Sequence, residues 1–160
     1  MGTTFSNAIG DLTLRGELGY TLDRYISTNA ASDRDGVIRA NELAYVIGLD
    51  WFGISDTLIS TQMFQSYISN HTRGTIRNER DTTFTSLIKH DSLNETLTTE
   101  LLWLHNLDLD DGLVRPKITY QMSDETTLWF GMDLFYGDPD GLFGQFKDRD
   151  RIVSAIEISF

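Results

Sequence analysis

The feature that most constrains the fold is the alternation of apolar and polar residues in the last ten residues, RIVSAIEISF. Successive side chains of an extended strand point to opposite faces, so Ile152, Ile156 and Ile158 share one face with Phe160, and Glu157 lies on the other. An alternating strand at the end of a sheet leaves backbone groups unpaired and one apolar face open. A closed barrel removes this edge by pairing its last strand with its first, so the pattern predicts a barrel.

The same alternation recurs along the chain. It predicts strands at residues 11–25, 42–52, 57–69, 82–89, 95–105, 113–122 and 126–136 before the last strand at 151–160. In residues 57–69 we place Ile59, Thr61, Met63 and Tyr67 outward, while the outward face of residues 82–89 stays open. Long polar connections at 27–41, 71–81 and 137–150 and a medium one at 106–112 alternate with short turns. Such asymmetry is typical of outer-membrane barrels.

We therefore predict an all-β fold, an eight-stranded antiparallel up-and-down transmembrane β-barrel of the outer-membrane type. Residues 1–160 form a single domain, and both termini lie on the periplasmic side. The chain has no apolar run near the roughly 20 residues that a spanning helix needs, which excludes helical membrane spans. No basic and apolar leader precedes the first predicted strand, so we expect a mature or engineered chain whose leader has been removed.

Charge and cysteine content exclude several function classes. A formal net charge of -11 argues against nucleic acid as a partner, because nucleic-acid binders carry a basic face. The absence of cysteine excludes disulfides, thiol nucleophiles and cysteine metal sites. We predict no enzyme activity, no cofactor and no metal, and the expected partner is a lipid bilayer or detergent.

Charged residues on the inward faces are predicted to form a polar network in the lumen. Its members are Arg15, Glu17, Asp50, Glu100, Arg115, Lys117, Asp133 and Glu157. An eight-stranded barrel is just wide enough to be filled by side chains, and an unpaired charge there costs several kcal/mol, so we expect mutual pairing. In a larger barrel the same residues would line an aqueous channel.

Aromatic residues are predicted to form two girdles at the membrane interfaces. The outer girdle comprises Tyr20, Tyr45, Tyr67, Trp103 and Tyr136, and the inner one Trp51, Tyr120 and Phe160. Two levels of aromatic residues are typical of a barrel whose outer surface contacts lipid.

Three segments carry a resemblance to a known family: RGELGYTLDRY, GLDWFGISDTLISTQMFQSYI and DGLVRPKITYQMSDETTLWFGMDLFYGDPDGLFGQFKDRDRI. They resemble a proteobacterial family of poorly characterised porin-like outer-membrane β-barrel proteins. The resemblance implies a bacterial outer-membrane location and a C-terminal portion of a longer chain, whose barrel would be wider. The terminal Phe160 resembles the C-terminal signal of such barrels, which implies that the outer-membrane assembly machinery binds the strand from Arg151 to Phe160.

Three other hypotheses remain open. A soluble lipocalin-like barrel would bury the apolar faces around a small ligand. An outer-rim lipid enzyme would need a Ser and a His in contact, for which Ser69 and His71 are the nearest candidates in sequence. Residues 31–42 resemble an EF-hand loop, with Asp33, Asp35 and Glu42 at suitable offsets but Ala31 in the first ligand position. The segment and the aspartates at 138, 140, 148 and 150 are expected to be ordinary solvated loops.

Overall fold

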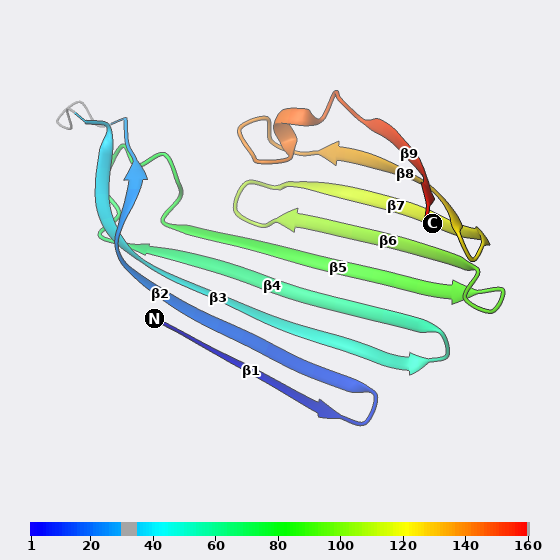
Figure 1. Ribbon diagram of the computed structural model, residues 1–160. Helices are drawn as coiled ribbons and strands as arrows, with labels where there is room; N and C mark the ends of the chain where they lie inside the picture. The colour runs from blue at the N-terminus through cyan, green and yellow to red at the C-terminus, as the bar shows by residue number, and fades with distance from the viewer. Residues whose placement is uncertain (30–34, 160) are drawn as a thin grey trace.

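The computed structural model describes residues 1–29 and 35–159. Within these residues, nine strands and one short 3-10 helix form the fold. They are β1 (Gly2–Ile9), β2 (Leu12–Ser27), β3 (Val37–Ile54), β4 (Thr57–Ser69), β5 (Arg80–Ser92), β6 (Leu97–Asn106), β7 (Asp111–Ser123), β8 (Thr126–Tyr136), η1 (Gly144–Phe146) and β9 (Arg151–Ile158). All nine strands belong to one antiparallel sheet in chain order (Figure 1). The prediction of an all-β antiparallel meander is confirmed.

The predicted number of strands is wrong, because nine strands are present in the described residues and β1 was missed. β1 has the sequence GTTFSNAI, in which Thr3 and Asn7 share a face with Phe5 and Ile9. These polar side chains among the apolar ones hide the apolar–polar alternation of the strand. Phe5 lies opposite Gly16 of β2, and a Cβ at Gly16 would overlap its ring.

The sheet is not closed by hydrogen bonds. Within the described residues, β1 pairs with β2 alone and β9 with β8 alone, so these two strands are the edges. The predicted eight-stranded closed barrel is therefore not observed. β1 and β9 run in the same direction, which places Met1 and Ser159 near opposite ends of the strands (Figure 1). The prediction that both termini lie at one end is wrong, because it left out β1.

The connections divide into two kinds. At one end of the strands lie tight turns at residues 10–11, 55–56, 93–96 and 124–125, in which Gly10 (φ 58°) and Asp56 (φ 55°) adopt left-handed backbone. At the other end lie the β2–β3 connection and those at 70–79, 107–110 and 137–150. The predicted asymmetry is present in part. The connection at 107–110 is no longer than the turn at 93–96, so the medium connection expected at 106–112 is not observed, and β3 begins at Val37 rather than at residue 42. β5 is continuous, with no register shift against either neighbour.

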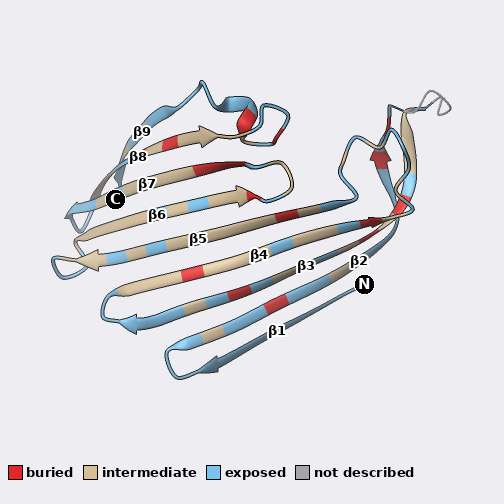
Figure 2. Ribbon diagram, turned by 180° about the vertical axis from the view of Figure 1, so that it is seen from behind, coloured by how far each residue is buried: buried red, intermediate tan, exposed pale blue. Residues whose placement is uncertain are grey.

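Neither face of the sheet has a packed core. Of the described apolar side chains, only Ile26, Ala40, Ile68 and Leu113 are buried. Three of them, Ile26, Ala40 and Ile68, form one small cluster at the long-loop end of β2, β3 and β4. Figure 2 shows short buried stretches in strands that are otherwise exposed or half-buried. No helix in the described part of the chain is long and apolar enough to cross a membrane.

Candidate functional site

One face of the sheet, here called the apolar face, gathers large apolar side chains from every strand. The register aligns Leu14 with Leu49 and Ile88 with Leu101 across their strand pairs. Further members are Phe5, Ile9, Leu12, Leu18, Ile47, Ile59, Met63, Ile118, Leu128, Phe130, Ile152 and Ile156. The placement of Ile59, Thr61, Met63 and Tyr67 on this face agrees with the sequence analysis. Ile47, Ile118 and Phe130 are 47, 49 and 47% exposed, so nothing in the described chain covers the face.

Polar side chains on the apolar face bond to one another. Tyr45 Oη donates to Gln65 Oε1 at 2.7 Å, and Gln65 Nε2 donates to Thr82 Oγ1 at 2.8 Å. Trp103 Nε1 donates to Tyr136 Oη at 2.6 Å. Because a polar group without a partner is costly in an apolar environment, these bonds suit a face that is out of water.

Seven of the predicted girdle residues lie on the apolar face. They are Tyr20, Tyr45, Trp51, Tyr67, Trp103, Tyr120 and Tyr136. Trp51 and Tyr120 lie near the tight-turn ends of their strands, and Tyr67, Trp103 and Tyr136 near the long-loop ends. Tyr20 and Tyr45 lie near the middle of β2 and β3, which extend beyond the other strands. Phe160 lies outside the described residues.

The opposite face, here called the polar face, carries all eight residues predicted for the lumen network. Three ion pairs form among them: Arg15 Nε with Asp50 Oδ2 at 2.9 Å, Lys117 Nζ with Glu100 Oε2 at 3.4 Å, and Arg115 with Asp133. Glu17 and Glu157 make no ion pair with any described residue.

Arg151 belongs to the polar face and was missed by the sequence analysis. Its Nε donates to Asp133 Oδ2 at 2.5 Å, so Asp133 is shared by two guanidinium groups and its side chain is 1% exposed. The signal was present, because Arg151 has the same strand parity as Glu157. Burial of a carboxylate is tolerated here because both oxygens accept charge-assisted hydrogen bonds.

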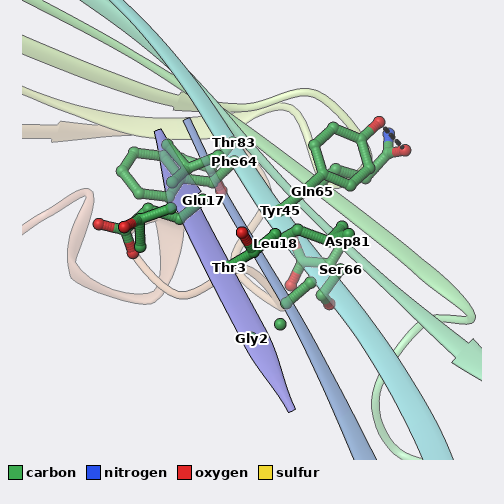
Figure 3. A pocket seen from close by; sticks show the side chains of 14 residues that line it. Gly2, Thr3, Glu17, Leu18, Tyr45, Phe64, Gln65, Ser66, Asp81 and Thr83 are labelled. Carbon is green, nitrogen blue, oxygen red and sulfur yellow. Dashed lines mark hydrogen bonds between the residues drawn. The ribbon is translucent and has the colours of Figure 1, made fainter. Parts of the chain in front are cut away.

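A hollow of about 700 Å³ lies over β1 to β5 (Figure 3). Its centre is a transverse row in which Gly2, Gly19, Ala44 and Ser66 are successive register partners, and Asp81 ends the row. These small side chains leave the space open. Glu17 and Phe64 flank the row, as Figure 3 shows. Asp81 Oδ1 accepts a hydrogen bond from Asn106 Nδ2 at 2.6 Å.

The β8–β9 connection folds onto the long-loop end of the polar face. Asp111, at the start of β7, is fully buried and its Oδ2 accepts hydrogen bonds from the backbone N–H groups of Phe143 (2.6 Å) and Gly144 (3.0 Å). Phe146 of η1 packs against Phe135 of β8, with ring centroids 5.6 Å apart. A Cβ at Gly144 would overlap the backbone of Asp138, so the close approach requires glycine. The sequence analysis missed Asp111 because it assigned that residue to an acidic connection.

The calcium hypothesis finds no support in the geometry. Ala31 and Asp33 lie outside the described residues, and Glu42 lies in β3, where it is buried and paired with Arg24 and with Arg77. Among the described residues, no group of three or more His, Asp or Glu side chains could hold a metal ion. Asp138 Oδ1 accepts the N–H of Asp140 within the loop at 2.9 Å, and Asp150 Oδ1 accepts the N–H of Phe135 in β8 at 2.8 Å. Both carboxylates therefore have hydrogen-bonding partners in the protein.

The three histidines lie at separate places in the described chain, and Ser69 and His71 do not bond to each other. His71 Nε2 lies 3.0 Å from the carbonyl oxygen of Arg77, and Ser69 Oγ donates to the carbonyl of Asn41 at 3.1 Å. His90 bonds Thr57, and His105 stacks between Trp103 and Tyr136 on the apolar face. The two groups proposed for an outer-rim enzyme are therefore engaged with backbone carbonyls.

Taken together, the geometry provides two opposite surfaces of different chemistry on one sheet. The apolar face presents large apolar side chains from all nine strands, and the polar face presents ion pairs and hollows. Comparisons of the chain with protein-family models, with curated proteins and with solved structures find no match.

Proposed function

We propose that this chain forms part of the wall of a transmembrane β-barrel of the outer-membrane type, with a porin-like or structural role. The observation that carries the proposal is the apolar face, which extends over all nine strands of the described chain and is covered by nothing within it. Monomeric proteins in water rarely expose a contiguous apolar patch of more than a few hundred Å². In a bilayer the same face would contact acyl chains without cost.

The alternation of faces also supports a barrel wall. In such a wall, lipid-facing and lumen-facing residues alternate along each strand, and aromatic residues gather near both interfaces. The polar face would then line the lumen, with its ion pairs lowering the cost of bringing charges into a confined space. Trp51 and Tyr120 at one end, and Tyr67 and Tyr136 at the other, would lie at the two membrane surfaces.

Closure of the wall requires partners for β1 and β9, since an edge strand cannot be left unpaired in lipid. We therefore place the nine strands in a barrel wider than eight strands, in line with the porin-like resemblance. The tight turns would face the periplasm and the long connections the exterior. The strand from Arg151 to Phe160 would present its free edge to the outer-membrane assembly machinery.

The test is refolding of the urea-denatured chain into phospholipid vesicles and, separately, into plain buffer. Insertion predicts carbonate-resistant association with vesicles, β-sheet circular dichroism and a gel mobility that changes on boiling. A matched pair of variants sharpens the result: Ile47→Arg places a charge on the apolar face and should reduce the inserted fraction, whereas Val46→Arg, one residue earlier on the polar face, should not. If the chain instead folds as a monomer in plain buffer and does not associate with vesicles, the proposal is rejected and the hypothesis of a soluble lipocalin-like barrel is favoured.

A further inference from the structure

A second hollow, of about 310 Å³, lies on the polar face over β7, β8 and β9. Its floor is Gly131 of β8, whose register partners are Lys117 of β7 and Val153 of β9. Trp129, two residues earlier on the same face, lies opposite Ala155. Because Gly131 has no side chain and Ala155 has a single methyl group, these residues leave the space above the polar face of β8 and β9 unfilled.

The end of the hollow at Asp133 is cationic. Asp133, two residues after Gly131 on the same face, is bonded by the Nε atoms of Arg115 and Arg151. The hydrogen bonds of these two arginines to described residues run through Nε alone, and their side chains are 41% and 61% exposed. Each arginine is thus held in place through one nitrogen and keeps its remaining donors for another acceptor.

The end of the hollow at Trp129 is aromatic. Lys117 Nζ lies 5.5 Å from the centroid of the Trp129 ring, within the range of a cation–π contact. The lining holds the three cations Arg115, Lys117 and Arg151 and the carboxylate of Asp133. Lys117 is also paired with Glu100 at 3.4 Å, so three cations face two carboxylates and one positive charge is left over. Residues four apart in a strand are roughly 13 Å apart, which is the separation of the arginine-bound Asp133 from Trp129.

We propose that this hollow binds an organic carboxylate joined to a flat ring. The carboxylate accepts hydrogen bonds from the free donors of Arg115 and Arg151, and the ring lies over Gly131 and against Trp129. Arg115, Arg151 and Trp129 all line the same hollow of about 310 Å³, which brings the cationic and the aromatic groups to one small ligand. The inference deepens the proposed function and rests on it in one respect, since the hollow opens to a lumen only if the polar face lines one.

The test is equilibrium dialysis of radiolabelled benzoate against the refolded chain in detergent micelles. We expect saturable binding, with the dissociation constant raised about tenfold by Arg151→Gln or by Trp129→Leu. Arg15→Gln is the matched control, because it removes a cation of the same face over β2, away from the hollow. Acetate, which lacks the ring, and benzyl alcohol, which lacks the charge, should displace benzoate only weakly.

Two outcomes would overturn the inference: benzoate that does not bind saturably, or binding that Arg15→Gln weakens as much as Arg151→Gln does. Circular dichroism checks that each variant is folded, and Arg115→Gln, which removes the other proposed donor, replaces Arg151→Gln if the latter fails to fold. Should the chain prove to fold in plain buffer, the dialysis is run there. The vesicle experiment tests membrane insertion and the dialysis tests benzoate binding, so the two proposals can fail independently.

Discussion

The two faces of the sheet differ in how their side chains find partners. On the polar face, charges pair across strands, as Arg15 does with Asp50 and as Arg115 and Arg151 do with Asp133. On the apolar face, large side chains such as Ile47 and Phe130 remain nearly half exposed. Most charged side chains named here on the polar face thus have partners within the sheet. The large side chains of the apolar face have no described residue packed over them. Under the proposed function this contrast assigns the apolar face to lipid, and single substitutions can test that assignment.

The largest expected effect comes from charging the apolar face. Ile47→Arg should lower the free energy of unfolding in vesicles by about 2–4 kcal/mol, since a lipid-facing arginine near the bilayer midplane costs that much. Val46→Arg should change the free energy of unfolding by less than about 1 kcal/mol, because Val46 lies on the polar face opposite Glu17. Glu17 makes no ion pair in the described chain and could pair with the new arginine. Urea titration followed by tryptophan fluorescence measures both. Equal effects would mean that the faces do not differ in environment.

A glycine pair compares packing on the two faces. Gly16→Ala should lower the free energy of unfolding by about 2 kcal/mol, because its Cβ would overlap the Phe5 ring on the apolar face and force it to move. In Gly19→Ala the new Cβ meets nothing nearer than the Ala44 carbonyl oxygen at 3.9 Å, so stability should be unchanged or slightly raised. The same titration measures both variants. If Gly16→Ala is as harmless as Gly19→Ala, Phe5 does not pack there and β1 is not fixed by this contact.

Replacing each of two arginine-paired aspartates of the polar face should change the free energy of unfolding by a smaller amount. Asp133→Asn should cost about 1–2 kcal/mol, since it leaves two guanidinium groups with one neutral acceptor, a loss reduced by their exposure to solvent. Asp50→Asn, which releases only Arg15, should cost less than about 1 kcal/mol. Unfolding at low and high salt measures the difference. A larger loss for Asp50→Asn would contradict the central place of Asp133.

Glu157 provides the smallest expected effect. Glu157→Gln should change the free energy of unfolding by less than about 0.5 kcal/mol, because Glu157 is exposed and makes no ion pair in the described chain. A substantial loss would reveal a partner contributed by strands beyond β9. The measurement is the same urea titration, and Asp133→Asn provides the positive control.

Strand positions and faces were largely predictable from the sequence, because a period of two places apolar and polar residues on opposite faces of a strand. Leu14, Leu18 and Leu49 alternate cleanly with polar neighbours, and the register confirms that they share a face. β1 escaped prediction because Thr3 and Asn7 occupy positions where an apolar side chain was expected. Such a strand is identified by its pairing with β2 and not by its own pattern.

Pairing partners on the polar face were less predictable. Strand parity places Arg15 and Asp50 on one face, but the register decides that they meet. Asp111 gave no signal at all, because its burial depends on a connection that begins 26 residues later and folds back over it. Closure is a property of the edges, which no residue pattern within a strand encodes. This explains why a closed barrel was predicted where an open sheet is observed.

The parallel course of β1 and β9 limits how a ring could be completed. If the two strands met directly, their hydrogen bonds would have to be slanted, forming the one parallel seam in an otherwise antiparallel sheet. An odd number of added strands between them would instead keep every neighbour antiparallel and bring the total to an even number, as in bacterial single-chain barrels. Counting the strands that complete the ring would therefore reveal which kind of seam it contains.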